Sequence, residues 1–195
     1  METPLHTERH PFEPFLPREA CILFLGSFPP QPKRWSMDFY YPNWINDFWR
    51  ICGLLFYGSR NWFEVPGEKR FDKERIMAFC TEKGFAMFDT ATEIRRLQDN
   101  ASDKFLEVVT PTDIPALLQQ IPACRALVTT GQKATDVLVE TYGCEEPQIG
   151  HYSEVEIAGR KYSFYRMPST SRAYPLALEK KAALYAILFR DLGLL

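Results

Sequence analysis

The sequence predicts an α/β fold in which helices cover a mostly parallel β-sheet. Three short apolar runs, at 22–25, 85–88 and 125–130, are each bounded by turn-forming residues, which is typical of buried strands. Segments with a helical spacing of apolar residues separate these runs, and strands that alternate with helices favour a parallel sheet. No internal repeat, low-complexity tract or linker interrupts the 195 residues, so we expect one domain over 1–195.

Local signals give the order of the elements. Gly84 is expected to end a helix, Asp113 to cap another, and Ala158-Gly159-Arg160 to form the turn of a hairpin. The predicted elements are an extended arm with four prolines at 1–20, a strand at 21–26, a helix starting near 43, a helix at 72–83, a strand at 85–88, an extended piece at 103–110, a helix at 113–121, a strand at 125–130, a helix at 132–142, strands at 153–157 and 162–165, and a helix at 176–190.

Composition excludes several classes of protein. Hydrophobic residues make up 46% and charged residues 25%, as in soluble globular chains, and no apolar run approaches the ~20 residues that span a bilayer. The N-terminus lacks the apolar core of a signal peptide, so we expect a cytoplasmic protein with no membrane partner. The net charge of −2 argues against strong non-specific nucleic-acid binding but allows a local basic face.

Metal sites are not expected either. The five cysteines are scattered and include no CxxC pair, which disfavours an iron–sulfur cluster or a zinc ribbon. His6 and His10 have the spacing of metal ligands on a helix, but they lie in the proline-rich arm, where no helix is expected.

The loop after the first strand carries an unusual set of side chains. Flat aromatic faces next to amides can stack a ring and read its hydrogen-bonding edge. The alternative is that the aromatics only pack the loop onto the sheet, since large aromatic side chains mostly serve cores. The residues concerned are Trp35, Phe39, Tyr40, Tyr41 and Trp44, with Gln31, Asn43 and Asn46.

Polar residues follow each predicted strand. In an open α/β sheet, ligands bind beyond the carboxyl ends of the strands, so these residues are expected to converge on one edge. They are Ser27 and Asn46 from the first loop, Asp89 from the second, Gly131 and Gln132 from the third, and 168–172 after the last strand. The chain has no GxGxxG, P-loop or GxSxG motif, so the set favours a hydrolysis in which the protein orients water and stabilises charge.

Five motifs in order resemble the uracil-DNA glycosylase superfamily, most closely its hypoxanthine/uracil branch. They are GSFPP at 26–30, YYPNWINDFW at 40–49, FDT at 88–90, VTTGQKA at 128–134 and MPSTSRAYP at 167–175. The resemblance implies a three-layer α/β/α sandwich with a short, mostly parallel central sheet. It also implies a monofunctional DNA glycosylase of base excision repair that flips out uracil or hypoxanthine and hydrolyses its N-glycosidic bond. The implied partner is DNA containing a damaged base, with no cofactor, no metal and no obligate protein partner.

The resemblance also assigns roles to residues. Asn46 matches the catalytic asparagine that positions the attacking water, and Tyr41 matches the aromatic that stacks on the flipped base. Gly26, Ser27 and Phe28 match the base-binding loop. The loop that grips the DNA backbone corresponds to Ser169, Thr170, Ser171 and Arg172.

Two departures bear on activity. Ser27 stands where mismatch-specific branches carry an asparagine, and Pro30 stands where the branch usually has glycine. Three aspartates, Asp38, Asp47 and Asp89, are candidates for an auxiliary carboxylate.

Structural interpretations remain open for the same residues. Asn46 can cap a helix, Ser169 and Ser171 can be turn serines, and the basic residues can form solvated surface; these are Arg95, Arg96, Arg172, Lys180 and Lys181. Two functional alternatives also follow: a catalytically inactive DNA- or base-binding module on the same fold, and a hydrolase of free nucleosides.

Overall fold

A five-stranded sheet forms the centre of the protein. We describe residues 6–98 and 103–195 of a computed structural model. The strand order is β3-β2-β6-β8-β7, with β2 (Ile22–Gly26), β3 (Phe85–Asp89), β6 (Ala126–Thr130), β7 (Tyr152–Ile157) and β8 (Arg160–Met167). The first four strands of this order run parallel, and β7 pairs antiparallel with β8. The predicted α/β fold class and the mostly parallel sheet are confirmed.

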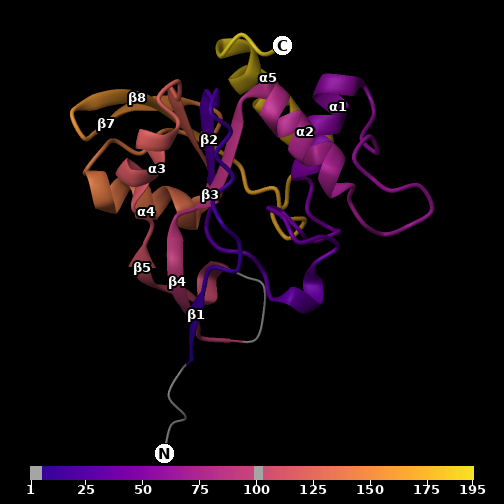
Figure 1. Cartoon of the computed structure of the whole chain (residues 1–195), viewed down its shortest axis with the longest axis horizontal. Helices are drawn as coiled ribbons and strands as arrows, with labels where there is room; N and C mark the ends of the chain where they lie inside the picture. Colours follow the sequence, from indigo (N-terminus) through magenta and orange to yellow (C-terminus); the bar gives the residue numbers. More distant parts are fainter. Residues whose placement is uncertain (1–5, 99–102) are drawn as a thin grey trace, which may run out of the picture.

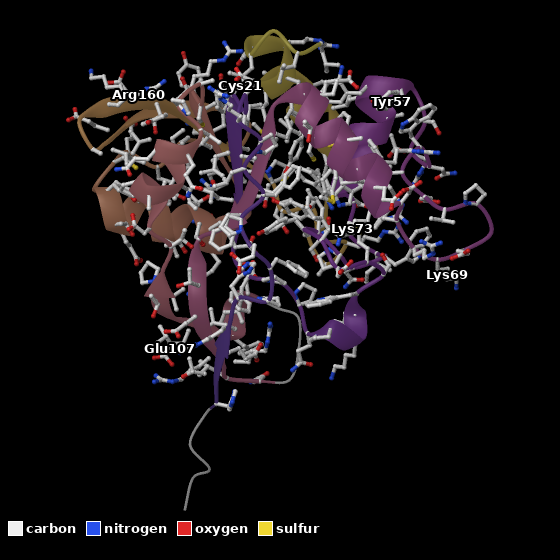
Figure 2. The ribbon with its side chains drawn as sticks, in the orientation of Figure 1. Cys21, Tyr57, Lys69, Lys73, Glu107 and Arg160 are labelled. Atoms are coloured by element: carbon white, nitrogen blue, oxygen red, sulfur yellow. The ribbon has the colours of Figure 1, made fainter. Side chains whose placement is uncertain are left out.

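Helices cover both faces of this sheet (Figure 1). On one face lie α1 (Phe48–Tyr57), α2 (Lys73–Lys83) and α5 (Leu178–Asp191), and on the other α3 (Ile114–Gln120) and α4 (Gln132–Tyr142). Every residue of β2, β3 and β6 is buried, as expected for parallel strands covered on both sides. Part of the loop at 58–71 extends outward, with exposed Lys69 at its outer edge (Figure 2), while its Phe63 and Phe71 are buried in the core.

Caps fix the helix boundaries that the sequence indicated. Asp72 accepts a hydrogen bond from the Arg75 N–H at 3.1 Å, and Gly84 ends α2 in the left-handed conformation. The helix expected to start near 43 starts only at Phe48. Residues 43–47 form turns instead, and the Asn46 side chain is part of them, as described below.

A second, smaller sheet was not predicted. It has the antiparallel order β1-β4-β5, with β1 (Thr7–Arg9), β4 (Ala91–Arg96) and β5 (Leu106–Pro111), and it lies beyond the carboxyl ends of the central strands (Figure 1). Two short 3-10 helices, η1 (Pro32–Arg34) and η2 (Asp103–Phe105), complete the fold. The predicted arm thus contributes a strand to this sheet, although its residues 1–5 lie outside the described residues.

The small sheet changes the interpretation of one basic residue. Arg96 on β4 pairs with Glu8, with 2.9 Å between Nε and Oε1, and its side chain is only 7% exposed. The surface-patch interpretation of Arg96 is therefore wrong, whereas the Arg95 side chain is 40% exposed and lies 3.5 Å from Glu107.

The C-terminal helix gives a second correction. Lys180 is exposed, as predicted for a solvated face, but its neighbour Lys181 is fully buried at 0% exposure. Among the helices of residues 6–98 and 103–195, none has the length and apolar character needed to cross a membrane.

Candidate functional site

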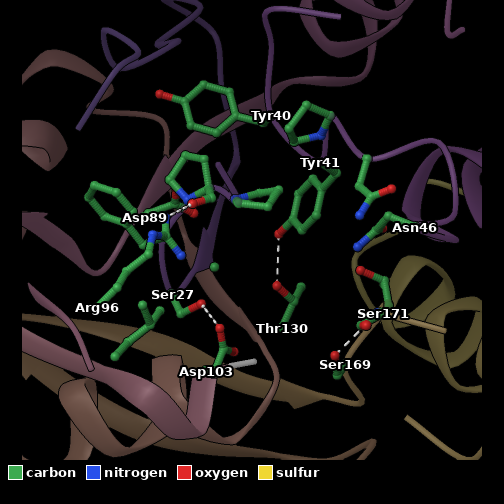
Figure 3. Close-up of a pocket in the computed structure, with 18 residues that line it drawn as sticks. Ser27, Tyr40, Tyr41, Asn46, Asp89, Arg96, Asp103, Thr130, Ser169 and Ser171 are labelled. Atoms are coloured by element: carbon green, nitrogen blue, oxygen red, sulfur yellow. Dashed lines mark hydrogen bonds between the residues drawn. The ribbon is translucent and has the colours of Figure 1, made fainter. Parts of the chain in front are cut away.

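A cavity lies at the carboxyl edge of the central sheet (Figure 3). Gly26, Asp89 and Thr130 end β2, β3 and β6, and Ser169 follows β8; all four line the cavity. The expected convergence of strand ends is confirmed, although Thr130 takes the place predicted for Gly131 and Gln132. The cavity volume of about 120 Å³ is many times the ~15 Å³ that holds one water molecule, so a small ring can enter.

Tyr41 forms an aromatic wall of the cavity. Its ring stacks on Phe48 with centroids 4.0 Å apart and planes 9° apart, and its hydroxyl lies 2.8 Å from Thr130 Oγ1. Burial raises the pKa of the Tyr41 phenol well above its usual value, which keeps the hydroxyl neutral. The residue has φ +52°, a left-handed conformation that strains a non-glycine residue and often marks a ligand site. Stacking on a flipped base remains a prediction.

Asn46 combines a structural contact with a place in the cavity. Its Oδ1 accepts the Phe48 N–H at 2.9 Å, which closes a turn over Asp47. Asp47 is the N-cap residue of α1, so Asn46 precedes the helix and the helix-cap interpretation is wrong. The side chain also lines the cavity and points toward it (Figure 3). Because one amide oxygen can accept two hydrogen bonds and the amide nitrogen can donate two, this contact leaves capacity for a water molecule. The catalytic role stays a prediction.

The first loop brings Gly26, Ser27 and Phe28 to the cavity, as predicted. A Cβ on Gly26 would lie only 2.7 Å from Asp89 Oδ1, so the missing side chain lets the carboxylate approach the strand end. The Ser27 hydroxyl donates to Asp103 Oδ1 at 2.7 Å. Burial raises the pKa of the Asp103 carboxyl above its usual value, and the charge of Asp89 raises it further.

Asp89 is held from outside the sheet by the N-terminal arm. His10 Nε2 lies 2.7 Å from Asp89 Oδ2, and the side chains are only 4% and 9% exposed. His10 Nδ1 lies 3.1 Å from the Phe12 nitrogen and 3.0 Å from the Phe12 carbonyl oxygen, so the backbone of the arm orients the ring. His10 thus binds a cavity carboxylate, so Asp89 cannot reorient freely.

Phe28 joins the small sheet to the cavity. It packs in a separate buried cluster with Ala91, Ile94 and Leu106. The Arg96 guanidinium lies 5.8 Å from the Phe28 ring centroid and donates to the Pro29 carbonyl at 2.6 Å. The small sheet therefore braces the loop that follows β2.

The loop after β8 forms the opposite wall. Ser169, Thr170 and Ser171 line the cavity, as expected. The Ser169 hydroxyl accepts the Ser171 N–H at 3.2 Å, and the Ser171 hydroxyl accepts the Ala173 N–H at 3.2 Å, so both are also turn serines. Contact with a DNA backbone stays a prediction for all three.

Arg172 lies outside the set that lines the cavity. Its Nε contacts Asp47 Oδ1 at 3.2 Å, and its side chain is 44% exposed. A role on DNA therefore requires the guanidinium to reach outward from this ion pair.

Sequence reasoning missed several residues of the site. Arg96 reaches it from the unpredicted small sheet, and His10, which directly follows β1, contacts the cavity residue Asp89. Asp103 lies on a short 3-10 helix with no periodic signal. Thr130 carried a signal, because it is the last residue of a predicted strand. Within residues 6–98 and 103–195, no three His, Cys, Asp or Glu side chains gather as a metal site.

Comparison with known proteins gives a fold relationship. No protein-family model matches the chain. No curated protein matches it either. Among solved structures, the chain is similar to the solution structure of a "putative Uracil DNA glycosylase" from Methanosarcina acetivorans, with TM-score 0.64 and 20% sequence identity. The match covers 96% of this chain and 99% of that protein, so the two share their fold over nearly the whole length.

Proposed function

We propose that this protein is a monofunctional DNA glycosylase that hydrolyses the N-glycosidic bond of a deaminated base, uracil or hypoxanthine, in DNA. The observation that carries the proposal is the cavity at the carboxyl edge of the sheet. There an aromatic ring (Tyr41), an amide (Asn46) and a hydroxyl-rich loop (169–171) face one space large enough for a ring. The shared fold with a protein described as a glycosylase supports a DNA substrate.

The chemistry suits the residues present. Flipping a base out of the duplex costs about a few kcal/mol, which stacking on an aromatic wall offsets. The C1′–N bond then breaks, its electron pair leaves with the base, and the sugar gains oxocarbenium character. Water, oriented by the Asn46 amide, forms the new C1′–O bond and releases its proton to a carboxylate or to solvent. Hydrogen-bond donors stabilise the charge that moves onto the base.

Geometry ranks the three candidate carboxylates. Asp38 is exposed and pairs with Lys73 at 3.0 Å, away from the cavity. Asp47 is held in ion pairs with Arg172 and Lys181. Asp89 alone of the three lines the cavity, so we assign the auxiliary carboxylate to Asp89.

The Asp89 carboxylate can serve either the attacking water or the edge of a deaminated base. Uracil and hypoxanthine each present a ring N–H beside a carbonyl, and a carboxylate accepts from such an N–H. The Ser27 hydroxyl and the carboxyl of Asp103, whose pKa is raised by burial, offer further polar partners on the same side of the cavity.

An alkali-cleavage assay tests the proposal. End-labelled single- and double-stranded oligonucleotides carry uracil, hypoxanthine, xanthine or a thymine mismatch, and strand scission after alkali reports an abasic site. We expect scission of the uracil or hypoxanthine substrate by the wild type and by Asn61→Ala, a matched control at an exposed position of the 58–71 loop. Asn46→Ala should lose most of the rate. DNA binding without an abasic product from any substrate would refute the enzyme and favour the binding module.

A further inference from the structure

A fully buried lysine lies behind the two loops that form one side of the cavity. Lys181 is on α5, and its side chain is 0% exposed. Lysine is almost never fully buried unless its charge is paired. The Lys181 ammonium contacts Asp47 Oδ2 at 3.2 Å and donates to the Ser171 carbonyl at 2.9 Å. The charge is thus shared between two chain segments.

These two segments carry residues of the candidate site. Asp47 directly follows Asn46, and Ser171 ends the hydroxyl-rich loop. The Asp47 N–H also donates to the Thr170 carbonyl at 2.9 Å, and Asn46 and Ser171 are bridge partners. Figure 3 shows Asn46, Ser169 and Ser171 close together on one side of the cavity. These contacts therefore fix the position of the Asn46 side-chain amide relative to the hydroxyls of Ser169 and Ser171.

Two cations pair with Asp47, and their solvent exposure indicates which of them holds the two segments together. Arg172 also pairs with Asp47, but its side chain is 44% exposed, so water competes for its guanidinium. Lys181 has no access to water, and its ammonium is satisfied only while both the Asp47 carboxylate and the Ser171 carbonyl stay in place. Displacing either loop leaves a buried charge with an unmet hydrogen bond.

We infer that Lys181 is a positioning residue, which holds the Asn46–Asp47 turn and the 169–171 loop in register so that the two face one substrate. The inference about register stands on the contacts alone. Its consequence for turnover rests on the proposed function, and the two are tested by separate readouts.

The test compares Lys181→Met with Lys180→Met, the same substitution one residue away on an exposed position. The first readout is hydrogen exchange of the residue 47 amide, which bonds to Thr170 in the folded protein. We expect at least tenfold faster exchange in Lys181→Met and no change in Lys180→Met. The second readout is single-turnover cleavage, where Lys181→Met should lower the rate at saturating DNA at least tenfold.

A double variant, Asp47→Asn with Lys181→Met, separates positioning from stability. It removes both buried charges, so the melting temperature should return toward that of the wild type. If Lys181 positions the loops, exchange at residue 47 stays fast and turnover stays low in the double variant. If slow exchange at residue 47 returns together with the melting temperature of the wild type, the inference is overturned. If the wild type cleaves no substrate, the proposed function fails, while the exchange readout still decides the role of Lys181.

Discussion

Replacing Asn46 with alanine should lower the cleavage rate far more than it lowers stability. The Asn46 side chain accepts the Phe48 N–H at 2.9 Å, and loss of such a hydrogen bond costs about 1 kcal/mol. For a chain of this length, that corresponds to a melting temperature lower by about 2–4 °C. A domain with ~5–15 kcal/mol of stability stays more than ~99% folded at 25 °C after this loss, so unfolding alone leaves the rate nearly unchanged.

A positioning role predicts a much larger effect on rate. Removing one hydrogen bond that acts in the transition state typically costs ~10²–10³-fold. Single-turnover cleavage at saturating DNA and thermal unfolding by circular dichroism measure the two effects on the same samples. The informative companion is Asn46→Ser, because a serine hydroxyl also accepts the N–H two residues on but is shorter than the amide.

The serine variant decides between the two roles. We expect Asn46→Ser to regain most of the melting temperature while its rate stays at least ~10²-fold low. A rate that returns with the melting temperature would show that Asn46 acts only by stabilising the turn before α1. A rate for Asn46→Ala within twofold of the wild type would remove Asn46 from the mechanism.

Three further predictions follow from contacts at the cavity. Gly26→Ala places a Cβ 2.7 Å from Asp89 Oδ1, so chemical denaturation should show a loss of about 1–3 kcal/mol and cleavage should fall. Tyr41→Phe removes the 2.8 Å contact with Thr130 but keeps the ring; the loss of about 1 kcal/mol should lower the melting temperature by about 2–4 °C, with cleavage within a few-fold of the wild type. Asp103→Asn tests a pH dependence of stability. Burial raises the folded-state pKa of Asp103 above 3.8, so the protonated carboxyl contributes fully to stability below pH 3.8. This contribution is lost as the pH rises through the raised pKa. The unfolding free energy of Asp103→Asn, measured from pH 4 to 8, should therefore improve relative to the wild type as the pH rises, and a constant difference would contradict this account.

Local signals predicted most of the central layers. The buried strands were visible because parallel strands covered on both faces are continuous apolar runs, as at Ile22–Gly26. The end of α2 was visible because Gly84 adopts the left-handed conformation there. The start of α1 was placed too early, because Asn43 and Asn46 stabilise turns in the same way that they stabilise a helix start.

The small sheet had no comparable signal. β1 is the polar tripeptide Thr7–Arg9, and β4 buries only Ala91 and Ile94, so neither shows an apolar run. Their pairing joins residues more than eighty positions apart, and the His10 contact with Asp89 spans 79. Such contacts depend on the tertiary fold rather than on local propensity.

The burial of Lys181 could be predicted from one sequence signal but not from another. Its burial follows from the register of α5, since it lies three residues after Leu178 and four before Tyr185, which are both buried. The helical period therefore places it on the apolar face and Lys180 on the opposite side. The charge of Lys181 suggested a solvent-exposed position, whereas the helical period correctly indicates that the residue is buried.

The central place of β2 has a consequence for how the chain folds. β2 lies between β3 and β6, so its two parallel partners arrive some sixty and one hundred residues later in the chain. The arm that holds Asp89 is made first, and the loop and lysine that complete the opposite wall are made last. Parallel pairing between distant segments is slow, because loop closure precedes any stabilising contact. The cavity is thus complete only when α5 has docked, so the proposed cleavage activity should appear late in folding.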